Sequence, residues 1–234
     1  LGLLKDNITK SGIYEEKDLE NAILKNIDEL GKGLLETFYI WGTNQKNLLQ
    51  LVRNIYGQEE IEKAEKKGNG IIFLTPHLGC FEISSIAYGV DRPITIMYRK
   101  LRKKWMNDLM TKGRGKGLVS LATADTRGLK KILNALGRNE AIGILPDQVA
   151  DKGQGENVDF FGRPAYTMVL VNKLISKTNA SVFISYAERL KNGEGFDIYA
   201  EEIKKKDIST PSDLNLHLEK AIKKNPTQYY WSYN

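Results

Sequence analysis

A histidine and a glutamate stand five residues apart in the segment from His77 to Glu82, HLGCFE. A carboxylate bonded to one imidazole nitrogen fixes the tautomer, so the other nitrogen can take a proton from an alcohol. On a regular helix, five residues turn two side chains apart by roughly 140°. His77 must therefore lie in a loop, with Glu82 in the first turn of the next helix. Pro76 and Gly79, both turn residues, favour this arrangement.

The spacing of this pair does not by itself establish catalysis. The chain holds 29 acidic residues and two histidines in 234 residues, so chance supplies such a pair in roughly a quarter of similar chains. The structural alternative is that His77 caps a helix while Glu82 favours its positive N-terminus.

A second polar turn, Leu145-Pro146-Asp147-Gln148, follows another short apolar run. Ligands of open α/β sheets bind beyond the carboxyl ends of the strands, so Asp147 and Gln148 can line the same pocket as His77. The alternative is that they are only turn formers. The polar stretch that follows leads to Phe160 and Phe161, which form either a lid over an apolar pocket or a surface loop pinned to the core.

A basic segment lies between these two turns. Charge runs mark a solvated face, but the apolar residues interleaved here also suit a membrane interface, with core packing as the alternative. The basic residues are Arg99, Lys100, Arg102, Lys103, Lys104, Lys112 and Arg114, and the apolar ones are Trp105, Met106, Leu109 and Met110.

Alternating strands and helices must position these residues. The patterns predict an α/β fold, with a central, largely parallel or mixed sheet covered by helices. Strands are expected at 71–75, 94–98, 118–121, 141–145 and 182–186, and helices at 80–88, 103–112, 126–136 and 166–178.

The first 69 residues are predicted to be helical. Apolar residues from Leu19 to Phe38 recur every three or four positions, and Asn44 can cap a second helix that carries Leu48 to Ile55. We expect a single domain over 1–234, with a helical part at 1–69 and an α/β core at 70–234.

Composition narrows the classes of function. The net charge of +6 favours an anionic partner such as a membrane surface, a phosphorylated lipid, an acidic carrier protein or nucleic acid. A single cysteine excludes an internal disulfide, and one cysteine with two histidines makes a zinc cage of those ligands implausible. The sequence has no apolar run of about 18 residues that would span a bilayer.

Six blocks in order resemble the bacterial lipid A biosynthesis acyltransferases, the late lauroyl and myristoyl acyltransferases. They are residues 71–82 (IIFLTPHLGCFE), Tyr98-Arg99, Arg114, 145–148 (LPDQ), 160–165 (FFGRPA) and 225–231 (NPTQYYW). The wider superfamily, which includes lysophospholipid and glycerophosphate acyltransferases, carries a histidine and an acidic residue five positions on, matching His77 and Glu82.

The resemblance implies acyl transfer from an acyl carrier protein thioester, or from acyl-CoA, to a hydroxyl of a phosphorylated lipid A precursor. It implies no metal and no cofactor beyond that co-substrate. The partners would be acyl carrier protein, an anionic glycolipid and a membrane surface, without nucleic acid. The expected location is the cytoplasmic face of the bacterial inner membrane, peripheral or anchored by an N-terminal segment absent from this chain.

The resemblance also implies roles for the site residues. His77 is the expected general base and Glu82 its orienting partner. Arg114 or backbone amides near His77 would stabilise the oxyanion, and Arg99 would contact a phosphate or carboxylate. Asp147, Gln148, Phe161 and Gly162 would line the pocket, and Cys80 is expected to be a small buried residue and not a nucleophile.

Two alternatives stay open. The same chemistry could serve another acceptor, namely a lysophospholipid, glycerophosphate or a phosphatidylinositol mannoside. A non-catalytic basic module that binds anionic membranes is the rival from another class, and in that case His77 and Glu82 would be incidental.

Overall fold

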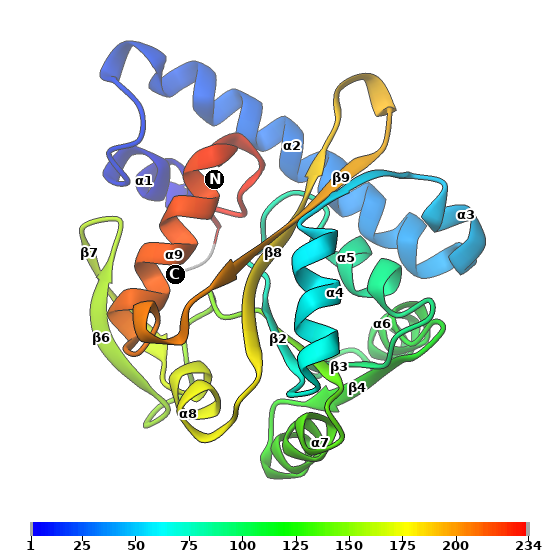
Figure 1. Ribbon diagram of the computed structural model, residues 1–234. Coiled ribbons are helices and arrows are strands. Elements are labelled where there is room, and N and C mark those ends of the chain that lie inside the picture. Colours follow the sequence, from blue (N-terminus) through cyan, green and yellow to red (C-terminus); the bar gives the residue numbers. More distant parts are fainter. Residues whose placement is uncertain (1, 233–234) are drawn as a thin grey trace.

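Short runs rich in isoleucine, valine and aromatic residues form a seven-stranded sheet at the centre of the molecule (Figure 1). The computed structural model describes residues 2–232. The strands are β1 (Val52–Tyr56), β2 (Ile71–Leu74), β3 (Ile94–Tyr98), β4 (Val119–Thr123), β5 (Ala141–Ile144), β8 (Ser181–Arg189) and β9 (Phe196–Ile203). Their order is β1-β9-β8-β2-β5-β3-β4, and within residues 2–232 only β8 and β9 of this sheet pair antiparallel. The predicted α/β class and the largely parallel or mixed sheet are confirmed.

Helices cover both faces of the sheet because successive strand residues point to opposite sides. Ile72 and Leu74 of β2 join a core with α1, α7, α8 and α9, whereas Ile71 and Phe73 pack with α4 on the other face. In Figure 1 α4 lies in front of the sheet. The helices are α1 (Gly2–Lys10), α2 (Glu16–Gly42), α3 (Gln45–Leu49), α4 (Gln58–Lys67), α5 (Phe81–Tyr88), α6 (Lys104–Arg114), α7 (Thr126–Gly137), α8 (Leu170–Lys177) and α9 (Pro211–Lys224).

The predicted helical character of residues 1–69 is only partly right. Asn44 does cap a helix, accepting a hydrogen bond from the backbone N–H of Asn47, but that helix ends at Leu49. Val52 and Ile55 lie in β1 instead, which pairs parallel with β9. Residues 52–56 are extended because they pair with the edge of β9. Their apolar spacing alone does not show that this edge exists.

The segment from 155 to 168 forms a hairpin of β6 (Gly155–Phe160) and β7 (Arg163–Met168). Phe161 and Gly162, at φ 51° and 69°, form a two-residue turn of the kind that favours positive φ. The helix expected from residue 166 therefore begins only at Leu170. Phe161 is buried and its ring centroid lies 5.1 Å from that of Trp231, which confirms the interpretation that this aromatic pins the segment to the core.

The long helix α2 follows the predicted apolar stripe over only part of its length. Leu19, Ile23, Ile27 and Leu30 pack against the core, whereas Leu34 and the residues after it include several exposed side chains. Among the described residues, no helix is long and apolar enough to cross a membrane.

Candidate active site

The register of two neighbouring strands brings His77 and Asp147 together. β2 and β5 are parallel, with Leu74 opposite Ile144, and each site residue stands three positions beyond that pair. The Thr75 N–H donates to the Ile144 carbonyl at 2.9 Å and extends the ladder toward the site. The carboxyl ends of parallel strands meet at one edge of a sheet, so both polar turns reach the same place.

Asp147 holds the histidine through two contacts. One carboxylate oxygen lies 2.8 Å from His77 Nδ1, and the other accepts the His77 backbone N–H at 2.7 Å. The Asp147 side chain is fully buried, while 7% of the His77 side chain is exposed. The carboxylate favours the tautomer with the proton on Nδ1, which leaves a lone pair on Nε2. Gln148 Nε2 lies 3.3 Å from that second nitrogen.

The predicted orienting role of Glu82 is wrong in this structure. Glu82 is the second residue of α5 and His77 precedes the helix, as the spacing argument required. However, the oxygens of Glu82 accept hydrogen bonds from Arg114 Nε and Nη2, at 2.7 and 2.5 Å. The guanidinium fork matches both carboxylate oxygens, so Glu82 orients Arg114, and Asp147 orients His77.

The C-terminal block, residues 225–231, fixes the loop that carries His77. The Tyr230 N–H donates to the His77 carbonyl and the Gly79 N–H to the Gln228 carbonyl, both at 3.0 Å. The Cys80 N–H reaches Ala187 of β8 at 2.8 Å. Apart from the family resemblance, the sequence gives no sign of a role for this block, because its contribution is made by backbone groups more than 140 residues away.

These contacts correct the expectation for the oxyanion. Each backbone N–H from His77 to Cys80 already donates, to Asp147, Pro76, Gln228 and Ala187 in turn. These four backbone N–H groups therefore hold the loop in place, and we no longer expect them to bind the oxyanion. Arg114 is the remaining candidate named from the sequence, and Gln148 joins it because its amide lies beside the imidazole.

His77 faces a cavity of about 840 Å³. Its polar wall includes Glu82, Arg99, Arg114 and Gln148. The apolar wall comes from several elements and comprises Trp41, Phe81, Met97, Leu101, Met110, Leu129, Ile144, Leu145, Met168, Val169 and Leu170. A cavity whose wall is partly charged and partly apolar suits an amphiphilic substrate.

A model of the bacterial lipid A biosynthesis acyltransferase family matches residues 12–234. The chain belongs to this family. It is 22% identical over 225 residues to the lipid A biosynthesis lauroyltransferase of Escherichia coli (strain K12), covering 92% of this chain and 72% of that protein. It is 21% identical over 223 residues to the palmitoleoyltransferase of the same strain, covering 93% and 72%. A lipid A biosynthesis acyltransferase of Haemophilus influenzae is 28% identical over 191 residues, covering 80% and 59%.

Family membership does not define the acyl chain. Lauroyl and palmitoleoyl appear in the names of relatives at almost the same identity. The lauroyl or myristoyl preference expected from the sequence therefore stays a prediction.

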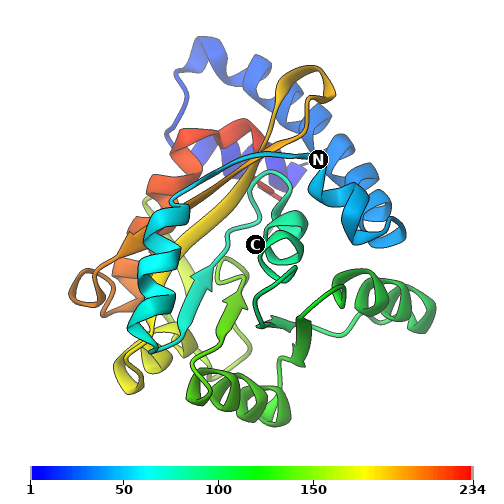
Figure 2. The same ribbon diagram turned by 45° about the vertical axis from the view of Figure 1, so that its right-hand side comes forward.

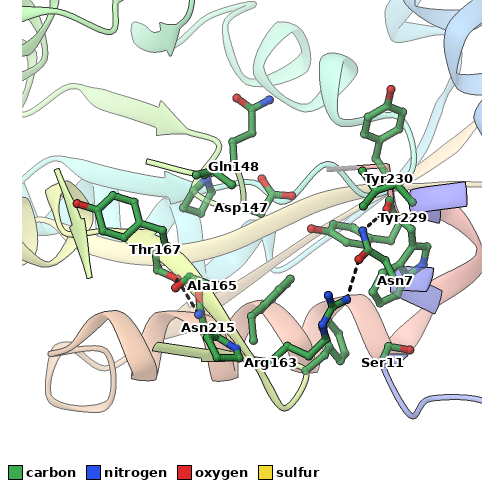
Figure 3. A pocket seen from close by; sticks show the side chains of 18 residues that line it. Asn7, Ser11, Asp147, Gln148, Arg163, Ala165, Thr167, Asn215, Tyr229 and Tyr230 are labelled. Carbon is green, nitrogen blue, oxygen red and sulfur yellow. Dashed lines mark hydrogen bonds between the residues drawn. The ribbon is translucent and has the colours of Figure 1, made fainter. Parts of the chain in front are cut away.

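Three of the blocks that carry the family resemblance, 145–148, 160–165 and 225–231, line a second, smaller cavity of about 270 Å³. Figure 3 shows Arg163 donating to Asn7, which in turn donates to the Trp231 carbonyl and ties α1 to the hairpin and the C-terminal block. Phe161 lines this cavity and not the one that His77 faces. Gly162 shapes the hairpin turn and does not appear in the wall of either cavity as the structure describes them.

Arg99 and Cys80 complete the expected site. Arg99 lines the His77 cavity, donates to the Val149 carbonyl at 3.0 Å and lies 3.4 Å from Asp151. It thus also holds the loop after β5. Cys80 is buried, and burial raises the pKa of its thiol well above the ordinary value. This agrees with a packing role, because the thiolate is the nucleophilic form.

Proposed function

We propose that this chain transfers a fatty acyl group from an acyl carrier protein thioester to a hydroxyl of a lipid A precursor, with His77 as the general base. The observation that carries the proposal is the His77–Asp147 pair, whose second imidazole nitrogen faces an amphiphilic cavity. Membership of the lipid A acyltransferase family supports acyl transfer onto lipid A.

The reaction follows from this geometry. The hydroxyl of the acceptor gives its proton to Nε2 of His77 while its oxygen attacks the thioester carbonyl carbon. Asp147 stabilises the imidazolium that forms and keeps the ring in position. The tetrahedral intermediate then collapses, the carbon–sulfur bond breaks, and the departing thiolate takes the proton back from His77. A positioned base of this kind contributes typically 10²–10⁴-fold to the rate.

Gln148 and Arg114 supply the donors in this mechanism. The Gln148 amide lies 3.3 Å from the nitrogen that must accept the proton, so the acceptor hydroxyl has to displace it. The displaced amide and the Arg114 guanidinium both lie in the cavity wall. They would stabilise the negative charge that grows on the carbonyl oxygen.

The charged rim of the cavity suits the proposed partners. Arg99, half of whose side chain is exposed, would contact a phosphate of the acceptor. The basic residues that follow it would attract an acidic carrier protein or an anionic membrane. Because the acceptor is a membrane lipid, we place the reaction at the cytoplasmic face of the inner membrane.

The test is transfer from acyl carrier protein thioesters of mixed chain length to a lipid A precursor, followed by mass spectrometry of the lipid. His77→Gln should lower kcat about 10²–10⁴-fold. His217→Gln is the matched control, since His217 contacts the Asp207 carbonyl at 2.9 Å, far along the chain in α9. Full activity of a folded His77→Gln protein would contradict the mechanism. Acylation of a lysophospholipid in preference to the lipid A precursor would contradict the acceptor.

A further inference from the structure

Some of the most exposed apolar side chains in the described part of the chain gather on two neighbouring elements. Leu34 and Leu35 near the end of α2 are 61% and 72% exposed, and Trp105 at the start of α6 is 60% exposed. Phe38 and Tyr39 of α2 are exposed as well. Phe38 and Tyr39 lie three and four residues beyond Leu35, so all three lie on one side of the helix.

These two elements contact each other beside the His77 cavity. A Cβ atom at Gly113 of α6 would come within 2.4 Å of Trp41 Cβ in α2, so only a glycine permits this approach. Figures 1 and 2 both place α6 next to the C-terminal half of α2. Thr37 and Trp41 line the cavity from α2, and Met110 and Arg114 line it from α6. The exposed apolar residues thus flank the reaction cavity.

The same region carries a dense positive charge. Five of the six residues from Arg99 to Lys104 are basic and all five are exposed. The acidic residue that α6 contains is Asp108. Glu36, within the apolar end of α2, points elsewhere and binds Arg189 of β8.

We propose that this region is a docking surface for an anionic lipid bilayer, which deepens and rests on the proposed function. The docking surface consists of Leu34, Leu35, Phe38, Tyr39, Arg102, Lys103, Lys104 and Trp105. Lysine and arginine attract anionic headgroups, and each is worth about fivefold in binding near such a surface. Leucine and tryptophan side chains enter the headgroup and acyl boundary, as an interfacial helix does.

Docking at this surface would bring a membrane lipid to the His77 cavity. A bilayer on the docking surface lies beside the wall formed by Thr37 and Trp41, so an amphiphile can pass from the membrane into the cavity along apolar side chains. Its acyl chains then need not cross water, where every exposed methylene is unfavourable. An acidic carrier protein would also be attracted by Lys103 and Lys104, but it gives no reason for four exposed apolar residues on α2.

Vesicle co-sedimentation tests the docking surface without substrate. The protein is mixed with vesicles of equimolar phosphatidylglycerol and phosphatidylcholine, and with phosphatidylcholine vesicles alone. We expect binding to the anionic vesicles, and a loss of about tenfold or more in the double variant Leu34→Glu, Leu35→Glu. The double variant Lys103→Ala, Lys104→Ala should lose about twenty-five-fold at low salt.

Matched controls come from other faces of the molecule. Leu216 of α9 is 61% exposed, as Leu34 is, so Leu216→Glu should bind vesicles like the unaltered protein. Lys66→Ala, Lys177→Ala removes two exposed lysines from α4 and α8 and should lower binding less than the α6 pair. Thermal unfolding of every variant checks the fold.

Equal losses in the controls and the docking variants would overturn the proposal, as would absence of vesicle binding by the unaltered protein. Vesicle binding that survives in the docking variants, together with lost transfer from a carrier-protein donor, would show a protein-binding surface instead. Failure of the proposed function is distinguishable: an inactive precursor assay with intact, surface-dependent vesicle binding would contradict the acyl transfer and leave the docking surface standing.

Discussion

At the scale of single residues, the two carboxylates beside the cavity have different tasks. Asp147 touches the imidazole of His77, and Glu82 holds the guanidinium of Arg114. The spacing in the sequence suggested Glu82 for the histidine, because it is near in the chain. The register of β2 and β5 supplies Asp147, and that register is invisible until the strand order is known.

We predict that Asp147→Asn lowers kcat about 10²–10⁴-fold with the fold preserved. The asparagine amide can donate to Nδ1 and so stabilise the tautomer with the proton on Nε2, which cannot act as a base. Steady-state kinetics and the pH profile of kcat measure this effect on His77. The mechanism has Asp147 act through His77, so the substitution should change the pH profile of kcat. An unchanged pH profile, with only a smaller amount of active protein, would mean that Asp147 stabilises the fold and does not orient the histidine.

Glu82→Gln should behave differently. It removes one partner of a nearly buried ion pair, in which the Arg114 and Glu82 side chains are 14% and 5% exposed, and we expect a loss of about 3–5 kcal/mol in the free energy of unfolding. Chemical denaturation measures that loss. A Glu82→Gln protein that is as stable as the original, but has the altered pH profile expected for Asp147→Asn, would return the orienting role to Glu82.

At the scale of elements, the His77 loop is a junction of β2, β8 and the C-terminal block. Gly79 shows how tight it is: its φ is +61°, and an added Cβ would lie 2.0 Å from the Ala187 carbonyl oxygen. Gly68, after α4, has nearly the same φ of +65° with nothing within 4 Å. Substitutions at the two glycines therefore distinguish the effect of the positive φ from the effect of the close contact with Ala187.

Gly68→Ala should cost only the backbone term, about 1–2 kcal/mol. Gly79→Ala should cost about 3 kcal/mol more, because the loop must move away from β8, and transfer activity should fall with it. Urea denaturation and the acyl-transfer assay measure the two effects. Equal stabilities for the two variants would mean that the loop yields easily and does not depend on this contact.

The helices and strands also show which parts of the fold can be predicted from the sequence. The strand at 94–98 and the helices at 80–88 and 126–136 follow from local patterns, and the structure has them within a residue or two as β3, α5 and α7. β1 and the β6–β7 hairpin do not, because their conformation depends on a distant partner strand or on a two-residue turn at Phe161 and Gly162. The family resemblance supplied the site residues, but the pairing among them required the sheet.

At the scale of the whole molecule, several buried groups make folding sensitive to alkaline pH. Burial raises the pKa of Cys80, Tyr88 and Tyr186, with Glu65 adding to the effect at Tyr88. Burial lowers the pKa of Lys116, which acts in the opposite sense. A group whose pKa is raised by folding gives up its proton first in the unfolded chain, so its contribution to stability is complete below the unfolded pKa and is lost as pH rises above it.

We therefore predict that the urea midpoint falls as pH rises past about 8.5, the ordinary pKa of a thiol, and falls further near about pH 10, where unfolded tyrosines ionise. In the unfolded chain the thiol of Cys80 ionises before the tyrosines do. In the folded protein this thiol is buried between α2, α3, α5 and β8. Cys80→Ala should remove the early part of the decline, which has a limiting slope of about 1.4 kcal/mol per pH unit for one proton. Tyr88→Phe should change only the later part, and this makes it the matched control. An unchanged early decline in Cys80→Ala would assign it to another group, and rapid alkylation of the native thiol at neutral pH would contradict the burial on which the prediction depends.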